Sequence, residues 1–362
     1  MNTLFVDPDI AKASTIASQF YTSPDWFELS KEKIFSKTWQ FCLGTDTLNE
    51  QGTLVPHNLL PDFLNEPLLF TKDEQGITRC LSNICTHRGK ILVDHPCTTQ
   101  KIKCPYHGRR FNYRGEFLYM PEFEQTKDFP SPREHLTPIP FNTLEPFIFA
   151  SLAPTVPFNE VFADIKERLF WLPMEQMRLD RERSRDYMVK AHWALYCENY
   201  LEALHIPFVH PGLRQVIDCT TYTTELYRYS NLQLALAREG EECFELPRES
   251  QDYGRRVAAY YYWIFPNTML NFYPWGCSVN NVQPISPELT KVSFLTYVLD
   301  KTKLGKGAGG ALDQVELEDE AVVESVQKGI KSRYYDTGRF SPTKEQGTHH
   351  FQRLLCEFLN EF

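Results

Sequence analysis

Two short segments of the sequence each bring one cysteine and one histidine together. Cys85 and His87 stand in the first segment and Cys104 and His107 in the second, and a glycine follows each histidine within two residues. Two thiolates and two imidazoles delivered in pairs suit a Rieske [2Fe–2S] centre, in which two Cys hold one iron and two His the other. A Cys2His2 zinc site is the alternative, but neighbouring zinc ligands normally have two to four residues between them. Because one residue separates Cys85 from His87, the spacing favours the cluster.

A second group of candidate ligands lies in the middle of the chain. Glu198, Glu202 and His205 are spaced to share one face of a predicted helix. His205 and His210 are five residues apart, which a continuous helix would splay by about 140°. Pro207 is expected to end the helix, so His210 can lie beside His205. The two imidazoles would supply part of a 2-His-1-carboxylate site for mononuclear Fe(II); a purely structural histidine pair is the alternative.

The missing carboxylate is sought by helical phase in the segment that follows Gly310. Apolar residues recur there from Leu312 to Ile330 and form a stripe about 100° wide, as an amphipathic helix requires. Asp319 falls in the middle of this stripe. Four other acids fall beside or outside it: Glu316, Glu318, Glu320 and Glu324. A core-facing carboxylate needs a partner, a proton or a metal ion, so Asp319 is predicted as the third iron ligand, with a buried salt bridge or a protonated acid as the alternative.

The elements that must position these residues divide the chain into three parts. Residues 1–40 are predicted to be helical, with Ser23-Pro24-Asp25 as a helix start. Residues 41–160 contain short β-like runs broken by Gly, Pro and Asn, which predicts a small all-β domain. Residues 161–362 combine longer strands, such as 258–265 and 292–299, with helices. The helices are predicted at 161–178, about 193–206 and 312–334.

Composition and charge exclude several classes of protein. The 362 residues carry a formal net charge of −9, which argues against a nucleic-acid partner because such a partner calls for a basic face. No run of about 18 apolar residues predicts a transmembrane helix, and the first residues do not resemble a signal peptide. We therefore expect a cytoplasmic protein whose 10 cysteines are reduced.

Taken together, these segments resemble the α subunit of Rieske-type non-haem iron ring-hydroxylating oxygenases. The resemblance rests on the two Cys/His loops, on the pattern Glu-Asn-x-x-Glu-x-x-His-x-x-x-x-His that ends at His210, and on the tail around Glu318-Asp319. It implies an α+β fold: an all-β Rieske domain over 41–160, then a helix-grip (START-like) catalytic domain over 161–362. The latter would have a curved antiparallel sheet and long C-terminal helices, with residues 1–40 packed against it.

The resemblance also implies a function and its cofactors. The chain would be the terminal oxygenase component, with a [2Fe–2S] cluster and mononuclear Fe(II), and would use O2 and electrons from an NAD(P)H-dependent reductase of the flavin or ferredoxin type. The acid three residues before the first histidine ligand would link the two metal sites across a homotrimer interface. In this sequence Glu202 would be that bridge, from His107 of a neighbouring subunit to His205.

The substrate is indicated by an aromatic stretch that looks most like the branch acting on choline, glycine betaine or carnitine. Five aromatic residues there are candidates for a cation–π cage around a trimethylammonium group, although alternating aromatics on strands are equally typical of a core: Tyr261, Trp263, Phe272, Tyr273 and Trp275. Hydroxylation or dihydroxylation of an aromatic ring is the alternative reaction. A non-catalytic Rieske electron carrier is the alternative from another class.

The sequence departs from the family pattern at a few positions. Arg109 stands where an aromatic residue usually follows the second Rieske His-Gly, and Leu204 stands where a tyrosine usually precedes the first histidine ligand. Neither is a predicted ligand, so the predicted iron chemistry is unchanged. A Gly-x-Gly-x-x-Gly pattern at 305–310 lacks the following strand and acid of a dinucleotide site, and we expect a loop there.

Overall fold

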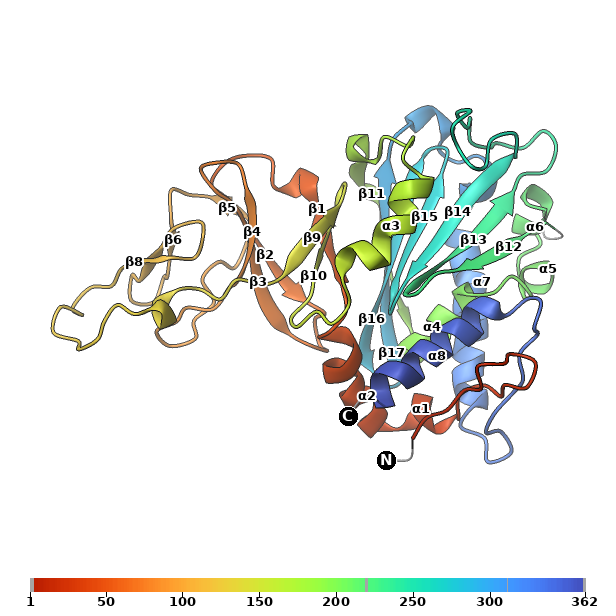
Figure 1. The fold of residues 1–362 in the computed structure, drawn as a ribbon, viewed down its shortest axis with the longest axis horizontal. Helices are drawn as coiled ribbons and strands as arrows, with labels where there is room; N and C mark the ends of the chain where they lie inside the picture. The colour runs from red at the N-terminus through yellow and green to blue at the C-terminus, as the bar shows by residue number, and fades with distance from the viewer. Residues whose placement is uncertain (1–2, 219–220, 311, 361–362) are drawn as a thin grey trace. The chain divides into compact units, whose positions relative to one another are not determined.

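The computed structural model describes residues 3–218, 221–310 and 312–360 (Figure 1). The chain forms two compact units, one of residues 39–154 and the other of residues 1–38 together with 155–362. The sequence predicted boundaries at 40 and 160. In the described part of the chain, no helix combines the length and the apolar character needed to cross a membrane.

The unit 39–154 is built from short antiparallel strands, as expected for a segment punctuated by Gly, Pro and Asn. The strands are β1 (Gln40–Gly44), β2 (Thr53–Leu59), β3 (Glu66–Lys72), β4 (Thr78–Ser82), β5 (Cys97–Thr98), β6 (Ile102–Lys103), β7 (Arg110–Phe111), β8 (Phe117–Tyr119), β9 (Phe141–Leu144) and β10 (Phe147–Ala150). They form sheets of order β1-β10-β9, β4-β3-β2-β5 and β6-β7-β8. Short 3-10 turns lie at Thr45–Thr47 and Pro132–Glu134.

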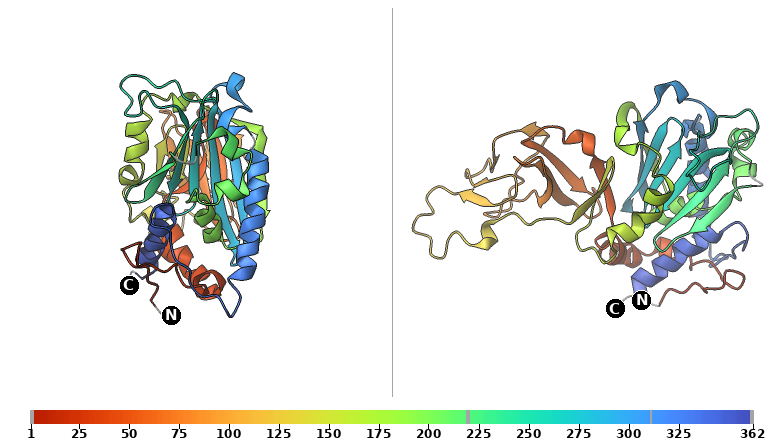
Figure 2. Two further views of the ribbon diagram at one scale, coloured as in Figure 1. Left: turned by 90° about the vertical axis from the view of Figure 1, so that its right-hand side faces the viewer. Right: turned by 45° about the horizontal axis from the view of Figure 1, so that its top comes forward.

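The other unit is organised around a seven-stranded antiparallel sheet of order β11-β17-β16-β15-β14-β13-β12. Its strands are β11 (Arg178–Val189), β12 (Thr223–Leu226), β13 (Ser230–Leu236), β14 (Val257–Ile264), β15 (Thr268–Tyr273), β16 (Gly276–Ser286) and β17 (Leu289–Val298). Residues of β14 and β15 are buried on both faces of the sheet, so elements cover it from two sides. Figure 2 shows the sheet between helices α3 and α7.

Helices of this unit come from both ends of the chain and from its middle. They are α1 (Gln19–Thr22), α2 (Pro24–Ser30), α3 (Phe158–Arg168), α4 (Trp193–Tyr200), α5 (Ile206–Val209), α6 (Leu213–Val216), α7 (Leu312–Gly329) and α8 (Gln346–Asn360). A π turn, Lys31–Phe35, continues α2, and 3-10 turns lie at Met174–Gln176, Lys301–Lys303 and Gly307–Gly309. This architecture confirms the predicted α+β class, with an all-β unit and a helix-covered antiparallel sheet.

Three helix boundaries differ from the sequence predictions. The helix expected over 193–206 is split, because α4 ends at Tyr200 and α5 begins at Ile206. Pro207 therefore does not end a helix; it lies in the first turn of α5, where its missing N–H costs no hydrogen bond. The first predicted helix runs over Phe158–Arg168 instead of 161–178, and α7 ends at Gly329 instead of continuing to 334.

Candidate metal centres and the pocket beside them

Two loops with the same hydrogen-bond pattern carry the first set of predicted ligands. In each loop the cysteine N–H donates to the carbonyl oxygen five residues later, over 2.8 Å, and the glycine four residues later donates back to the cysteine carbonyl. Gly89 and Gly108 take φ values of +69° and +75°, a left-handed conformation that glycine adopts without a steric cost. The repeated sequence pattern thus becomes a repeated backbone shape that presents two equivalent ligand pairs.

The side chains of these loops turn toward one another. The Nδ1 atoms of His87 and His107 lie 3.1 Å apart, and Cys85 and Cys104 are buried in one apolar cluster. Two imidazole nitrogens on one side and two sulfurs on the other are the donor set of a Rieske centre. The residues present therefore fit a [2Fe–2S] cluster.

The buried side chain of Arg109 connects the two loops. Its side chain is 2% exposed, and its Nη1 donates to Thr86 Oγ1 over 2.6 Å and pairs with Glu134 over 3.2 Å. Thr86 lies between the first cysteine and histidine ligands, so a residue at the end of the second loop holds the first loop. The guanidinium also lies over three aromatic rings: Phe117, Phe123 and Phe129.

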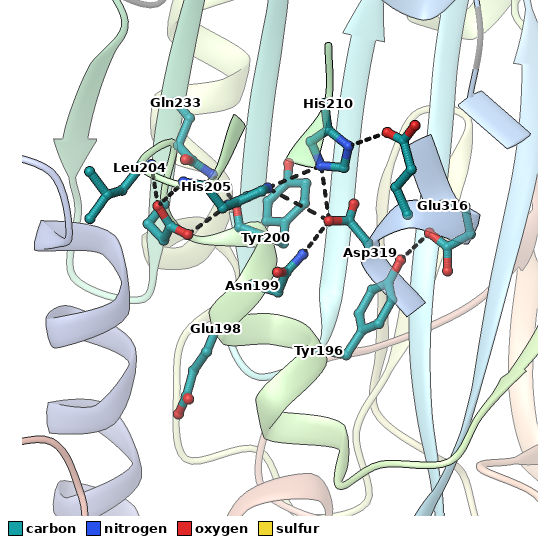
Figure 3. Close-up of polar contacts among 12 residues, drawn as sticks. Tyr196, Glu198, Asn199, Tyr200, Leu204, His205, His210, Gln233, Glu316 and Asp319 are labelled. Carbon is teal, nitrogen blue, oxygen red and sulfur yellow. Dashed lines mark hydrogen bonds and ion pairs between the residues drawn. The ribbon is translucent and has the colours of Figure 1, made fainter. Parts of the chain in front are cut away.

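The second set of predicted ligands also converges, in the other unit (Figure 3). His205 Nε2 and His210 Nε2 lie 3.2 Å apart, and Asp319 Oδ1 lies 3.6 Å from the first and 3.0 Å from the second. A circle through these three atoms has a radius of about 1.9 Å, so one divalent ion can contact all three at about 2.1 Å, a usual metal–imidazole distance. Two imidazoles and one carboxylate on one side of an ion match the facial triad of non-haem Fe(II).

Three further polar side chains orient these candidate ligands. Glu202 Oε1 lies 2.6 Å from His205 Nδ1, and Glu318 Oε2 lies 2.7 Å from His210 Nδ1. These bonds occupy the outer nitrogen of each ring and direct Nε2 inward, as outer carboxylates do at many metal sites. Asn199 Nδ2 donates to Asp319 Oδ1 over 2.6 Å. The sequence did not predict these roles for Glu318 and Asn199; their places beside the predicted ligands Asp319 and His205 are the only signal for them.

The placement of Glu198 contradicts the predicted shared helix face. Its carboxylate points away from the histidines (Figure 3) and accepts hydrogen bonds from Tyr21 over 2.6 Å and Gln352 over 2.9 Å. The prediction was wrong because α4 ends at Tyr200, so the helical phase that joined Glu198 to His205 does not continue. Burial raises the pKa of Glu198 to about 7, although both hydrogen bonds act in the opposite direction.

A pocket opens beside the histidines and the aspartate, and aromatic residues line much of it. Tyr261 and Tyr273 line this pocket, whereas Trp263 and Phe272 do not. Phe272 pairs with Tyr260 on the opposite face of the sheet. Trp263 lies on the same face as Tyr261 but packs beneath α8. The other aromatic residues that line the pocket are Tyr196, Tyr200, Tyr222 and Phe294.

Trp275, the fifth aromatic residue considered for the cage, lies behind the pocket wall. Its ring stacks on Tyr273 with 5.1 Å between centroids and 16° between planes. The pocket therefore keeps part of the predicted aromatic set and adds tyrosines from α4 and from the segment before β12.

The charged groups of this pocket are acidic. Glu202, Glu316 and Asp319 line it, and none of the described lining residues is lysine or arginine. Glu316 is 2% exposed, although helical phase had placed it beside the apolar stripe of α7. Burial raises its pKa to about 8, while a hydrogen bond from Tyr196 acts in the opposite direction. That burial arises because α4 packs along α7 and covers a wider face than the apolar stripe.

Models of two known protein families match this chain. A model of the Rieske [2Fe–2S] domain matches residues 39–130, and a model of the ring-hydroxylating α subunit, catalytic domain, matches residues 174–361. The chain belongs to the ring-hydroxylating oxygenase family. It is a Rieske non-haem iron oxygenase, the terminal oxygenase component, whose cofactors are a [2Fe–2S] cluster and mononuclear iron. Enzymes of this family take electrons from reductase or ferredoxin partners and use O2.

Two relatives cover nearly the whole oxygenase. Chloroplastic choline monooxygenase of Arabidopsis thaliana is 29% identical over 371 residues, spanning 96% of this chain and 84% of the relative. The carnitine monooxygenase oxygenase subunit of Escherichia coli (strain K12) is 25% identical over 364 residues, spanning 97% and 95%.

Solved structures agree on the fold. A quaternary ammonium Rieske monooxygenase, described for carnitine oxidation and inter-subunit electron transfer, superposes with a TM-score of 0.81 at 23% identity, over 99% of this chain and 100% of the other. A naphthalene 1,2-dioxygenase variant bound to phenanthrene gives a TM-score of 0.74 at 16% identity, over 96% and 93%. The shared fold thus spans enzymes of different substrates.

Proposed function

We propose that the oxygenase hydroxylates or oxidatively demethylates a small quaternary ammonium compound. The observation that carries this proposal is the pocket beside the candidate iron ligands, which combines tyrosine rings with carboxylates and has no described lysine or arginine in its lining. Aromatic faces attract a trimethylammonium cation, and carboxylates add a favourable charge. The choline and carnitine monooxygenases among the relatives support the same substrate class.

The chain's own residues would hold and orient the reactants. We assign His205, His210 and Asp319 as ligands of the mononuclear iron and Cys85, His87, Cys104 and His107 as ligands of the cluster. The bound iron supplies the chemistry of oxygen activation. The tyrosines would fix the cationic head and exclude water, so that one carbon next to the nitrogen faces the iron ligands. Hydroxylation of an N-methyl carbon would release formaldehyde and the demethylated amine.

We further propose that Glu202 is the electron bridge between subunits. Its carboxylate is bonded to His205 Nδ1, and its side chain is 15% exposed, so one face of it remains open to a neighbour. A homotrimer would bring His107 of a neighbouring subunit to this face. Inter-subunit transfer, described for the similar quaternary ammonium monooxygenase, supports this arrangement.

The remaining assignments are also proposals. Residues 41–160 would serve as the Rieske domain and 161–362 as the catalytic domain, with 1–40 packed on the latter. The electron donor would be a flavin or ferredoxin-type reductase that uses NAD(P)H. The cytoplasmic location expected from the sequence stays a prediction.

A single turnover tests the reaction. Chemically reduced oxygenase, O2 and a mixed panel of quaternary amines and simple aromatics are combined, and the products are read by mass spectrometry. A hydroxylated or demethylated amine is expected. A hydroxylated ring or a diol would overturn the substrate class and favour the aromatic alternative, whose fold is shared by the naphthalene dioxygenase variant. Iron and acid-labile sulfide are counted on the same sample: about three irons and two sulfides per chain are expected for an oxygenase, and about two of each for an electron carrier.

The bridge is tested with Glu202→Gln, which keeps the shape of the side chain and removes its charge. The variant should bind both metals, yet its reduced cluster should pass electrons to the mononuclear iron far more slowly. Stopped-flow absorbance of the cluster after mixing with O2 and substrate measures this step. An unchanged rate would contradict the bridge. Glu324→Gln, the same change on α7 outside the pocket, is the control.

A further inference from the structure

Glu316 presents a buried carboxylate to the pocket that the iron chemistry does not use. We propose that Glu316 is the counter-ion of the substrate's cationic nitrogen and that it selects substrates carrying a net positive charge over zwitterions. This inference rests on the proposed quaternary ammonium chemistry and adds to it a specific residue and a narrower class of substrate.

The position of Glu316 on its helix sets the reach of its carboxylate. Glu316 and Asp319 are three residues apart on α7, so they share one face and are separated by about 4.5 Å along the helix axis. The carbon to be oxidised lies one or two bonds from the cationic nitrogen in a small quaternary amine. When that carbon faces the iron ligands, the positive charge therefore lies within a few ångströms of this part of α7.

The hydrogen bonding of Glu316 leaves one buried oxygen unpaired. Tyr196 Oη donates to Oε2 over 2.5 Å, whereas Oε1 is buried and has no hydrogen-bond partner among the described residues. A buried carboxylate oxygen without a partner is costly unless a ligand or a cation compensates it. A trimethylammonium group offers no N–H, but it brings positive charge and fits an oxygen that has no fixed donor.

The other carboxylates of the pocket are already committed. Asp319 contacts both histidines and Asn199, and Glu202 is bonded to His205 and to the backbone N–H of Leu204. Glu316 is therefore the lining acid that is left to pair with the substrate. Burial raises its pKa to about 8, and a bound cation would favour its ionised form.

The same charges act against a substrate carboxylate. Because none of the described lining residues is lysine or arginine, a betaine- or carnitine-like carboxylate would find acids and no basic partner. A choline-like alcohol instead has a neutral end, and hydroxyl and amide groups line the pocket at Tyr200, Asn271 and Asn280. The lining thus favours a compound with a net charge of about +1 at neutral pH.

Equilibrium binding to the oxidised, metal-loaded protein separates charge from shape. Choline is compared with 3,3-dimethylbutan-1-ol, which replaces the nitrogen by carbon and is neutral, and with glycine betaine and carnitine. Isothermal titration calorimetry without a reductant keeps turnover out of the measurement. The wild type should bind choline at least tenfold more tightly than the neutral analogue and than either zwitterion.

Glu316→Gln retains an oxygen that can accept from Tyr196 and loses only the charge. Choline binding should weaken at least tenfold in this variant, while binding of the neutral analogue changes less than twofold. Glu324→Gln, which removes an acid of the same helix outside the pocket, should leave both affinities unchanged. Iron content and the visible spectrum of the cluster confirm that each variant is folded and loaded.

The outcomes distinguish the two levels of the proposal. A wild type that binds none of the quaternary amines overturns the proposed function itself. Two results would overturn the role of Glu316 alone: unchanged choline affinity in Glu316→Gln, or an equal loss of affinity for choline and its neutral analogue. In either case the residue would serve only to hold α4 against α7 through its hydrogen bond with Tyr196. Tighter binding of a zwitterion than of choline overturns the selection for net charge. If Glu316→Gln does not fold, Glu316→Asp should keep choline binding within about fivefold, and Tyr196→Phe, which removes this hydrogen bond but keeps the charge, should do the same.

Discussion

The two metal sites of this oxygenase are assembled in different ways. The cluster ligands come from a segment of 23 residues, 85–107, and two loops of equal hydrogen-bond pattern present them. The mononuclear site joins His205 and His210 to Asp319, which lies more than 100 residues later on α7. The first site therefore depends on local backbone geometry, whereas the second depends on the packing of α7 against the segment that carries the two histidines.

The two sites also differ in the charge around them. A buried arginine, Arg109, braces the cluster loops, whereas acids line the pocket beside the iron ligands. A cationic neighbour stabilises the electron that a Rieske cluster receives, and an acidic pocket stabilises a cationic substrate. The contrast indicates that each unit has an electrostatic environment suited to the species it handles, and the following variants test it.

Removal of the distant ligand should separate the sites most clearly. Asp319→Ala leaves only two imidazoles to bind the iron. If the iron no longer stabilises the transition state by several kcal/mol, turnover should decrease by about a thousandfold or more. The cluster should keep its visible and EPR spectra, because its ligands lie in the other unit. Loss of the cluster signal from a folded Asp319→Ala protein would contradict the independence of the two sites.

Loss of the hydrogen bond that orients Asp319 should reduce iron affinity and turnover less than loss of Asp319 itself. Asn199→Ala removes the 2.6 Å hydrogen bond to Asp319, and loss of such an orienting partner typically lowers metal affinity or activity by about 10- to 100-fold. Iron content after dialysis against a chelator, together with turnover, measures the effect. An unchanged affinity would show that packing alone orients Asp319.

Glu198 connects α4 to Tyr21 of α1 and Gln352 of α8, and its buried carboxyl should make the stability of the protein depend on pH. Burial raises the pKa of Glu198 to about 7 from 4.5, so the folded protein holds this proton more tightly than the unfolded chain. The resulting stability is present below about pH 4.5 and is lost as the pH rises through about 7. Glu198→Gln keeps an acceptor for Tyr21 and Gln352 without titrating, and it should be more stable than the wild type by about 3 kcal/mol at pH 8.

Unfolding of this variant and of the wild type is followed between pH 5 and 8, with Glu324→Gln as the control. The wild type should lose stability relative to Glu198→Gln across this range. Parallel pH profiles would show that Glu198 is already ionised in the folded protein.

Arg109 is expected to give the smallest effect. Arg109→Gln keeps a donor for Thr86 but removes a buried charge beside the cluster ligands. The ratio of reduced to oxidised cluster at a fixed potential should fall about tenfold, which is about 59 mV for one electron. Glu134→Gln, which removes the partner anion, should shift the potential in the opposite direction. A redox titration that shows no shift in either variant would contradict the idea that the charge of Arg109 stabilises the reduced cluster.

The sequence predicted a large part of the candidate site because ligand spacing, turn glycines and helical phase each act over a few neighbouring residues. Cysteine and histidine spacing and the glycines after them predict two similar loops, and these are what the structure contains. The pairing of His205 with His210 was expected for a related reason, although the expected role of Pro207 was wrong. Helical phase selected Asp319, which faces the histidines. The ligand roles of these residues stay predictions.

The sequence alone therefore determined the elements and the order of the chemical groups, since periodicity, glycine and proline act over a few residues. Only the tertiary structure decided that α4 ends at Tyr200, that Glu198 turns toward the chain termini, and that Glu316 is buried in the pocket. It also decided which aromatics reach the pocket: Tyr261 does, whereas Trp263 on the same strand face is covered by α8. Burial depends on which distant elements pack against a face, and no local pattern records that.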